Sequence, residues 1–237
     1  MFKKFSHRSY NLEHLDKGDY TADEYEECLS ELRFINRFLG DRKALYNSLI
    51  EDVKRKNLKA FTVLDVGAGS GYLLKVIAEW ARKNSRKVML VGLEINERAA
   101  RAILGESAVY TEIRAVRADA LKLPFRDGAF DYVICSLFIH HFHEQEIVKI
   151  FNEMTRVASE KIIVIDLERH WLAYYLYLIF SRVFLKNRLV REDGALSIKR
   201  GFLKTELEKL AKQADLKNVK ITTSSPFRLV LSAEKKF

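Results

Sequence analysis

The chain is poor in the residues that mark several protein classes. Its 237 residues include only two cysteines, Cys28 and Cys135, which excludes a disulfide framework and favours a reducing compartment. Two prolines and ten glycines exclude collagen-like and low-complexity chains. No stretch reaches the roughly 18 consecutive apolar residues of a membrane-spanning helix, and no apolar signal core follows the N-terminal lysines. Together these absences predict a cytoplasmic globular protein.

Basic residues, in contrast, are in excess. Lysine and arginine number 41 against 32 aspartates and glutamates, which gives a formal net charge of +9. A basic surface can attract nucleic acid, anionic lipid or an acidic substrate. Because the basic residues are not concentrated in one tract, a general contribution to solubility is the favoured interpretation. The hydrophobic share of 48% is enough for a sizeable buried core.

The pattern of apolar residues changes near residue 60. Residues 1–60 read as helical, with Thr21 and Glu24 at the spacing of a capping box, and a second helix is expected over 41–56. Short apolar runs then alternate with amphipathic segments, which is typical of βαβ units. The runs expected to form strands are 61–66, 88–93, 113–116, 130–135, 162–167, 217–223 and 227–234.

This alternation predicts an α/β fold, a Rossmann-like doubly wound sheet of about seven strands with an N-terminal helical cap. The cap is expected over residues 1–60 and the main domain over 61–237. Within the domain, the segment 171–185 (WLAYYLYLIFSRVFL) is rich in aromatic residues and is uncharged from Trp171 to Ser181. Three interpretations of this segment remain open: a lid over an apolar pocket, a buried core helix, or a contact with a membrane surface.

A glycine-rich turn follows the first expected strand and carries Gly67, Gly69 and Gly71. Glycine lets the chain turn tightly and brings backbone N–H groups against a ligand. A phosphate-binding P-loop would need a Lys-Ser or Lys-Thr pair after Gly71, where the chain continues with Tyr72. A dinucleotide fingerprint would need its third glycine at position 72. The P-loop is therefore excluded, and a dehydrogenase is disfavoured.

The turn and its acidic neighbour, DVGAGSG at 65–71, resemble motif I of class I S-adenosylmethionine-dependent methyltransferases. ADALKLPF at 118–125 and FDYVICS at 130–136 resemble later motifs of that family, in the expected order. INRFLG at 35–40 and EDGALSIKRGF at 192–202 look like a small-molecule subfamily, similar to quinone-biosynthesis and polyketide-associated methyltransferases. The resemblance implies S-adenosylmethionine as cofactor and S-adenosylhomocysteine as product.

The resemblance also implies which residues hold the cofactor. The glycine turn packs against its methionine part, Asp119 contacts the adenine amino group, and Ala120 backs the adenine ring. At the end of the second strand, a carboxylate such as Glu94 can accept both hydroxyls of a ribose. The expected cofactor-binding residues are Asp65, Gly67, Ala68, Gly69, Gly71, Glu94, Ile95, Asp119, Ala120 and Ser136.

Three histidines, His140, His141 and His143, follow the fourth expected strand. Because histidine titrates near neutral pH, one of them can take a proton from the acceptor. His141 is the first candidate for this catalytic role and His140 the second, with local packing and helix capping as the alternative. No carboxylate or cysteine is helpfully placed beside them, so no metal site is expected. Asp166, which ends the fifth strand, and Arg169 and His170, which follow it, are expected to shape the acceptor pocket or to cap the aromatic helix.

The predicted function is methyl transfer to a small, fairly apolar acceptor, with O-methylation as the first expectation and C-methylation as the second. A nucleic-acid (RNA) methyltransferase is the alternative that the net charge suggests, although the proline motif of many base methyltransferases is missing after the fourth strand. A non-catalytic cofactor-binding protein of the same fold is another alternative. Peripheral membrane contact through 171–185 is a further expectation, and the sequence indicates no oligomeric state.

Overall fold

A seven-stranded sheet forms the centre of the structure, a computed structural model that describes residues 5–36 and 40–235. The strands are β1 (Ala60–Val66), β2 (Lys87–Glu94), β3 (Ile113–Arg117), β4 (Phe130–Ser136), β5 (Ala158–Leu167), β6 (Lys217–Ser224) and β7 (Arg228–Glu234). Their order is β3-β2-β1-β4-β5-β7-β6, and only β7 runs antiparallel to its neighbours. The predicted doubly wound sheet is confirmed. The strand order reverses between β1 and β4, where such sheets open a ligand crevice at their carboxyl edge.

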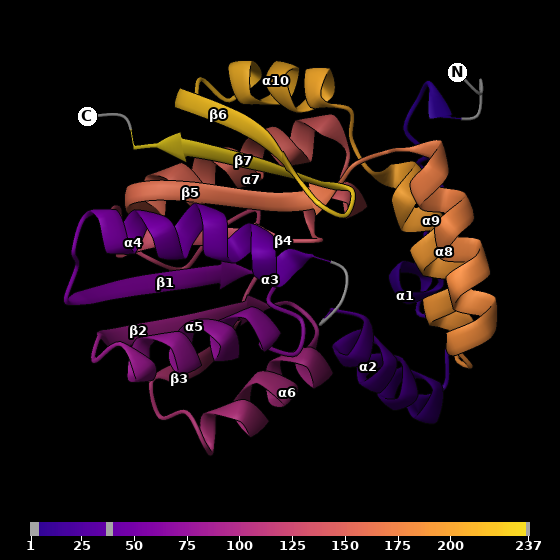
Figure 1. Ribbon diagram of the computed structural model, residues 1–237, viewed down its shortest axis with the longest axis horizontal. Coiled ribbons are helices and arrows are strands. Elements are labelled where there is room, and N and C mark those ends of the chain that lie inside the picture. The colour runs from indigo at the N-terminus through magenta and orange to yellow at the C-terminus, as the bar shows by residue number, and fades with distance from the viewer. Residues whose placement is uncertain (1–4, 37–39, 236–237) are drawn as a thin grey trace.

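Helices cover both faces of the sheet (Figure 1). One face carries α7 (Glu144–Val157) and α10 (Lys204–Gln213); the other carries α5 (Tyr72–Lys83), α6 (Glu97–Ser107), α3 (Asp41–Leu45), η2 (Tyr46–Ile50) and α4 (Glu51–Arg55). Phe151 of α7 and Leu49 of η2 are completely buried, one in the core of each face. The segment 41–55 was expected as one helix. It packs against this face of the sheet, and its middle part, η2, is a π-helical turn.

A second helical layer, here called the cap, faces the carboxyl ends of the parallel strands (Figure 1). Its helices are α1 (His14–Lys17), α2 (Ala22–Asn36), α8 (Trp171–Phe184) and α9 (Arg188–Arg200). They share a small apolar core that includes Phe5, Cys28, Tyr177 and Leu189. The helical N-terminus is confirmed. We propose that the cap comprises residues 5–36 together with 171–200.

Local sequence signals explain the cap only in part. The predicted capping box is present, since the backbone N–H groups of Thr21 and Glu24 each donate to the other residue's side chain. Helix α9 was not expected, because Asp193 and Gly194 are poor helix formers in its interior. Residues 37–39 of the subfamily segment lie outside the described residues. Among the described helices, none combines the length and the apolar character that crossing a membrane requires.

Gly92 in β2 lies where the sheet, α5 and α6 pack closely beside the glycine turn. A substitution at this position tests how tight the packing is. A Cβ at Gly92 would lie 2.8 Å from Ile103 and 3.1 Å from the Cβ of Ala68, whereas a Cβ at Gly105 would meet no atom within 4 Å. We expect Gly92→Ala to lower the free energy of unfolding by about 1–3 kcal/mol through overpacking. Gly105→Ala should raise it by about 0.5–1 kcal/mol, because alanine favours the helix. Urea denaturation measures both, and equal effects of the two changes would contradict this packing.

Candidate active site

The glycine turn is fixed against two neighbouring strand ends. Gly67, Gly69 and Gly71 have φ values of 70°, 55° and 78°, in the left-handed region that favours glycine. The N–H of Gly67 donates to the carbonyl of Leu93 at 2.9 Å, which ties the turn to the end of β2. A Cβ on Gly67 would lie 2.1 Å from the ring of Phe138, in the loop after β4. The turn therefore fits only when this position has no side chain.

Two carboxylates flank the turn in a desolvated setting. Glu94 accepts a 2.6 Å hydrogen bond from the N–H of Gly69. Asp65 is buried, and its Oδ1 has no hydrogen-bond partner among the described residues. Burial, reinforced by the charge of Glu94, raises the pKa of Asp65 well above its usual range. Burial also raises the pKa of Glu94, although backbone N–H groups offset part of this effect. A cation or a hydrogen-bond donor bound beside these carboxylates would offset the free-energy cost of burying them.

The sequence-predicted cofactor residues all lie near the carboxyl ends of β1 to β4, and they fall into two groups. Asp65, Gly67, Ala68, Gly69 and Ser136 line a cavity of about 460 Å³ between the sheet and the cap, whereas Gly71, Glu94, Ile95, Asp119 and Ala120 do not line it. Ile95 is 64% exposed just beyond β2, and Asp119 is exposed and accepts the N–H of Leu121. The second group thus lies outside the cavity.

The cap gives the cavity a largely apolar wall. Its apolar lining includes Leu32 and Ile35 of α2, Leu176 and Phe180 of α8, and Leu189 and Ile198 of α9. The segment 171–185 forms α8, which borders the cavity; this position is compatible with the lid interpretation, which stays a prediction. His170 accepts the N–H of Leu172 and so caps this helix, as one of its two expected roles predicted.

His140 is held rigidly between the sheet and the cavity. It is 3% exposed, and its Nδ1 lies 2.7 Å from Oδ1 of Asp166 at the end of β5. Its backbone N–H donates to Oδ2 of Asp166 at 3.2 Å. Burial alone would raise the pKa of Asp166, but the charge and hydrogen bond of His140 outweigh it and hold the pKa below its usual range. With Nδ1 fixed in this way, the other ring nitrogen, Nε2, is left to face the cavity side.

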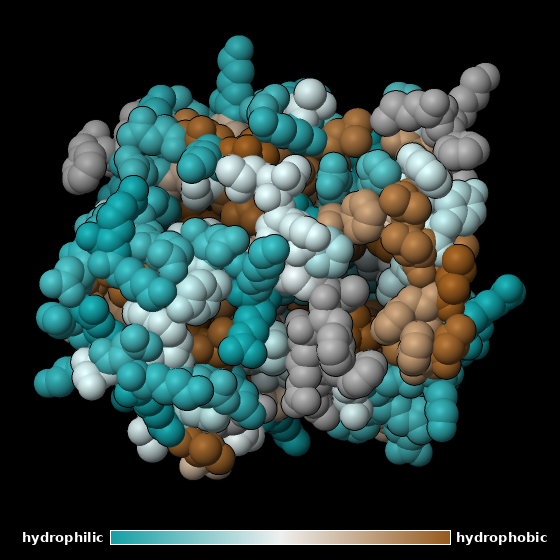
Figure 2. All heavy atoms as spheres, in the orientation of Figure 1, coloured by the Kyte–Doolittle hydropathy of each residue, from teal (hydrophilic) through white to brown (hydrophobic). Residues whose placement is uncertain are grey.

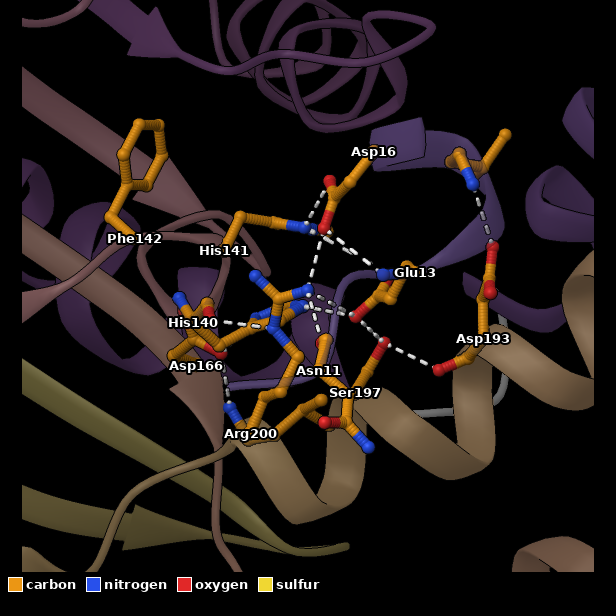
Figure 3. Close-up of polar contacts among 12 residues, drawn as sticks. Asn11, Glu13, Asp16, His140, His141, Phe142, Asp166, Asp193, Ser197 and Arg200 are labelled. Atoms are coloured by element: carbon orange, nitrogen blue, oxygen red, sulfur yellow. Dashed lines mark hydrogen bonds and ion pairs between the residues drawn. The ribbon is translucent and has the colours of Figure 1, made fainter. Parts of the chain in front are cut away.

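The N-terminal segment adds two acids that the sequence analysis missed. Figure 3 shows Glu13 and Asp16 beside the two histidines. Asp16 lies 3.0 Å from Nδ1 of His141, and Glu13 lies 3.8 Å from Nε2 of His140. Glu13 also accepts a 2.8 Å hydrogen bond from the hydroxyl of Ser197 in α9. No local pattern marks these acids, because they lie in a distant part of the sequence.

Buried arginines fasten the N-terminal segment 5–17, here called the arm, over the site. Arg8 donates to the carbonyl of Arg200 at 2.9 Å and to that of His140 at 3.2 Å. Arg169 donates to the carbonyl of Phe5 at 2.9 Å. Arg200 in turn donates to the carbonyl of His140 at 3.0 Å. Hydrogen bonds to charged donors are among the stronger ones, so these contacts position the arm and its acids.

Comparison with known proteins agrees with this geometry. The profile of a methyltransferase domain matches residues 63–161, from the core of β1 into β5. A demethylmenaquinone methyltransferase of Staphylococcus aureus is 26% identical over 183 residues, which cover 70% of this chain and 71% of the relative. A SAM-dependent methyltransferase structure from Aquifex aeolicus superposes with a TM-score of 0.64 at 16% identity, covering 91% of this chain and all of its own. Human N-acetylserotonin methyltransferase, solved with SAM, gives 0.65 at 12% identity over 97% of this chain and 64% of its own.

The domain match includes the glycine turn and the strand ends described above. Residues 63–161 form a methyltransferase domain, and the similar proteins support a class I S-adenosylmethionine-dependent methyltransferase. The predicted activity class and cofactor are thereby confirmed. The turn of this methyltransferase also fits the cofactor physically: a Cβ on Gly69 would meet open space, and Asp65 offers a buried acceptor without a partner among the described residues. The amino group of the cofactor's methionine part can donate a hydrogen bond to Oδ1 of Asp65.

Among the residues that the structure describes, one group could ligate a metal: Glu13, His140 and His141, whose ligand atoms lie within 4.8 Å of one another. The expectation that no carboxylate lies near the histidines was therefore wrong, because the arm supplies Glu13 and Asp16. The guanidinium of Arg200 lies 3.9 Å from Glu13, and its positive charge opposes a divalent cation there. Nδ1 of His141 is also engaged by Asp16. We interpret the group as an acid–base cluster.

The pKa of Glu13 in this methyltransferase predicts a pH dependence of stability. Burial raises the pKa from 4.5 to about 7. The folded state therefore binds more protons than the unfolded state between these values, and stability falls as pH rises through that window. Glu13→Gln should abolish this fall and make the protein more stable than the wild type by about 1–3 kcal/mol near pH 8. Urea denaturation at several pH values tests this. The exposed Glu208→Gln is the control and should leave the wild-type slope; an unchanged slope in Glu13→Gln would contradict the assignment.

Proposed function

We propose that this methyltransferase acts on a small, fairly apolar acceptor with an acidic hydroxyl, giving an O-methyl product; a C-methyl product is the second candidate. The observation that carries the proposal is the apolar cavity, which is lined both by the glycine turn and by His140, the histidine that Asp166 contacts. Two similar proteins support a ring-shaped acceptor, since their names specify demethylmenaquinone and magnesium protoporphyrin IX as substrates. The aromatic and aliphatic side chains of the cap suit such a molecule.

We further propose how the cofactor is held. Glu94 accepts the ribose hydroxyls, Asp119 the adenine amino group, and Asp65 the methionine amino group. Ile95 and Ala120 flank the adenine ring, and the backbone from Gly67 to Gly71, with Ala68, packs against the methionine part. Ser136 lies at the end of β4 between the turn and the acceptor side. The raised pKa of Asp65 supports its role, because a cation beside it would stabilise the charged form.

The proton of the acceptor needs a base, and the contacts favour His140 over His141, which reverses the order expected from sequence. When bound, S-adenosylmethionine supplies a methyl group on a positively charged sulfur. Asp166 holds the proton on Nδ1 of His140, so Nε2 of the neutral ring can accept the hydroxyl proton while the acceptor oxygen takes the methyl. Glu13, 3.8 Å from Nε2, can stabilise the protonated ring. The cap walls exclude water from the reacting groups.

Nucleic acid is disfavoured as the acceptor. Apart from the histidines, Arg228 is the one cationic residue among the described side chains that line the cavity, and it is paired with Asp41 at 2.6 Å. Binding to a nucleic acid depends on cations that meet its phosphates. The net charge of +9 therefore resides away from the reacting groups.

The cofactor assignment predicts a loss of affinity in Glu94→Ala. The wild type should bind S-adenosylhomocysteine, and the variant should bind it about 10- to 100-fold more weakly, because two hydroxyls lose a charged acceptor. Glu97→Ala, at an exposed position just after β2, is the matched control and should bind like the wild type. Calorimetric titration measures all three. A folded wild type without affinity, or an unaffected Glu94→Ala, would overturn the assignment.

The base assignment predicts a selective loss of turnover. With an acceptor found in a panel of phenols and quinols, His140→Gln should lower kcat by about 100- to 10,000-fold, and Asp166→Asn should lower it while shifting the pH profile. Affinity for S-adenosylhomocysteine should change little in either variant. His143→Gln is the matched control, because this histidine caps α7 and does not line the cavity. If His141→Gln lost turnover and His140→Gln retained it, the sequence-based order would be restored.

A further inference from the structure

Helix α8 has two apolar faces, one of which points away from the protein. Ala173, Tyr174, Tyr177 and Ser181 are buried. On the opposite side, Leu172, Tyr175, Ile179 and Val183 recur at spacings of three or four residues and are exposed, up to 69% for Val183. In Figure 2 hydrophobic atoms gather at the edge of the molecule where Figure 1 places α8. Contiguous apolar surface of this kind marks a contact with a partner or a membrane.

A basic cleft adjoins this exposed face. It has a volume of about 480 Å³ and lies between α8 and α9, where Arg182, Arg188, Arg191 and Lys199 line it together with a single acid, Glu192. Glu192 is engaged by His14 at 2.9 Å, and Arg188 by Glu24 at 2.8 Å. Neither Arg182 nor Arg191 forms an ion pair with any residue that the structure describes. The cleft therefore holds uncompensated positive charge.

We propose that this surface docks on an anionic phospholipid bilayer. The exposed side chains of α8 enter the apolar boundary of the membrane, and the cleft receives a lipid phosphate. A helix with an apolar face, aromatic residues and flanking cations has the chemistry of an interfacial helix. Trp171 and Tyr175 suit the boundary, because their rings combine an apolar body with a polar group. Leu176 and Phe180 of the same helix line the acceptor cavity, so docking would bring an apolar acceptor to the site.

A second copy of the chain is a poorer occupant of the surface. A two-fold dimer through α8 would place the apolar face against itself and add a second Arg182 and Arg191 to an already basic surface. Like charges at an interface oppose association. The bilayer instead offers negative charge beside apolar chains, so it matches both features at once. This docking does not depend on the identity of the acceptor or on which residue is the base.

The test is co-sedimentation of the full chain with phosphatidylcholine vesicles that contain or lack phosphatidylglycerol. We expect binding to the anionic vesicles and weak binding to the neutral ones. Ile179→Ser with Val183→Ser should reduce binding about 10- to 100-fold, because two exposed side chains no longer enter the apolar region. Arg182→Gln with Arg191→Gln should reduce binding to anionic vesicles by roughly 10-fold or more, at about 1 kcal/mol per cation.

Matched controls separate this surface from general effects. Lys83→Gln with Lys87→Gln removes the same charge at the end of α5 and the start of β2, and Val109→Ser with Leu104→Ser removes exposed apolar groups elsewhere. Both pairs should bind vesicles like the wild type. Because the chain's other tryptophan, Trp80, is buried, a fluorescence shift on docking should come from Trp171 and disappear in Trp171→Phe.

Several results would overturn the proposal. One is a wild type that ignores anionic vesicles, and another is a control pair that loses as much binding as its test pair. Light scattering that shows a dimer abolished by the Ile179 and Val183 changes would identify a second copy as the occupant. Inorganic phosphate that binds the cleft without any vesicle binding would leave only an anion site. Affinity for S-adenosylhomocysteine, measured on the same variants, should stay at the wild-type value, so failure of docking is distinguishable from failure of the proposed function.

Discussion

One half of the candidate site, formed by the two histidines with Glu13 and Asp16, depends on buried guanidinium groups. Arg8, Arg169 and Arg200 donate to backbone carbonyls of the arm, of α9 and of the loop after β4, and so join three parts of the chain that are far apart in sequence. Each guanidinium is buried, so unsatisfied donors are costly, and Nη1 of Arg8 is the one buried nitrogen of the three groups that has no partner among the described residues. This requirement fixes the arm in place. Glu13 and Asp16 reach the histidines because the arm does.

The other half, which is proposed to hold the cofactor and consists of the glycine turn with the strand ends around it, has a different physical basis. Parallel pairing of β1 with β2 and β4 brings their carboxyl ends to one edge, and the glycine turn closes on Leu93 at that edge. Gly67 must lack a side chain because Phe138 occupies the space. Steric and backbone constraints therefore shape this half, whereas charge and hydrogen bonding shape the other. Of the proposed cofactor residues, Asp65, Gly67, Ala68, Gly69 and Ser136 share one cavity with His140.

Helix α8 connects the interior of the site to the outside of the molecule. Its cavity side carries Leu176 and Phe180, and its outer side carries Ile179 and Val183. The buried side of the helix packs in the core of the cap, and Tyr177 joins it closely to α9. The tyrosine hydroxyl donates to the carbonyl of Val190, and the absence of a side chain at Gly194 leaves space for the ring. This close approach lets one helix present apolar groups on two sides.

The sequence by itself determined the sheet, the order of its elements and the glycine turn, because these follow from local signals. Strand and helix periodicity, capping at Thr21 and glycine at positions of positive φ act over a few residues. The methyltransferase class followed from the same short segments. The individual cofactor contacts and the choice of base stay predictions, although the positions named for them lie near one edge of the sheet.

Only the tertiary structure decided which groups meet across long sequence separations. The pairing of His140 with Asp166, the approach of Glu13 to both histidines and the basic cleft beside α8 leave no local pattern in the sequence. Helix α9 formed despite Asp193 and Gly194, since packing in the cap outweighed their weak helix propensity. A contact between distant residues depends on how whole layers pack, and no spacing along the chain encodes it.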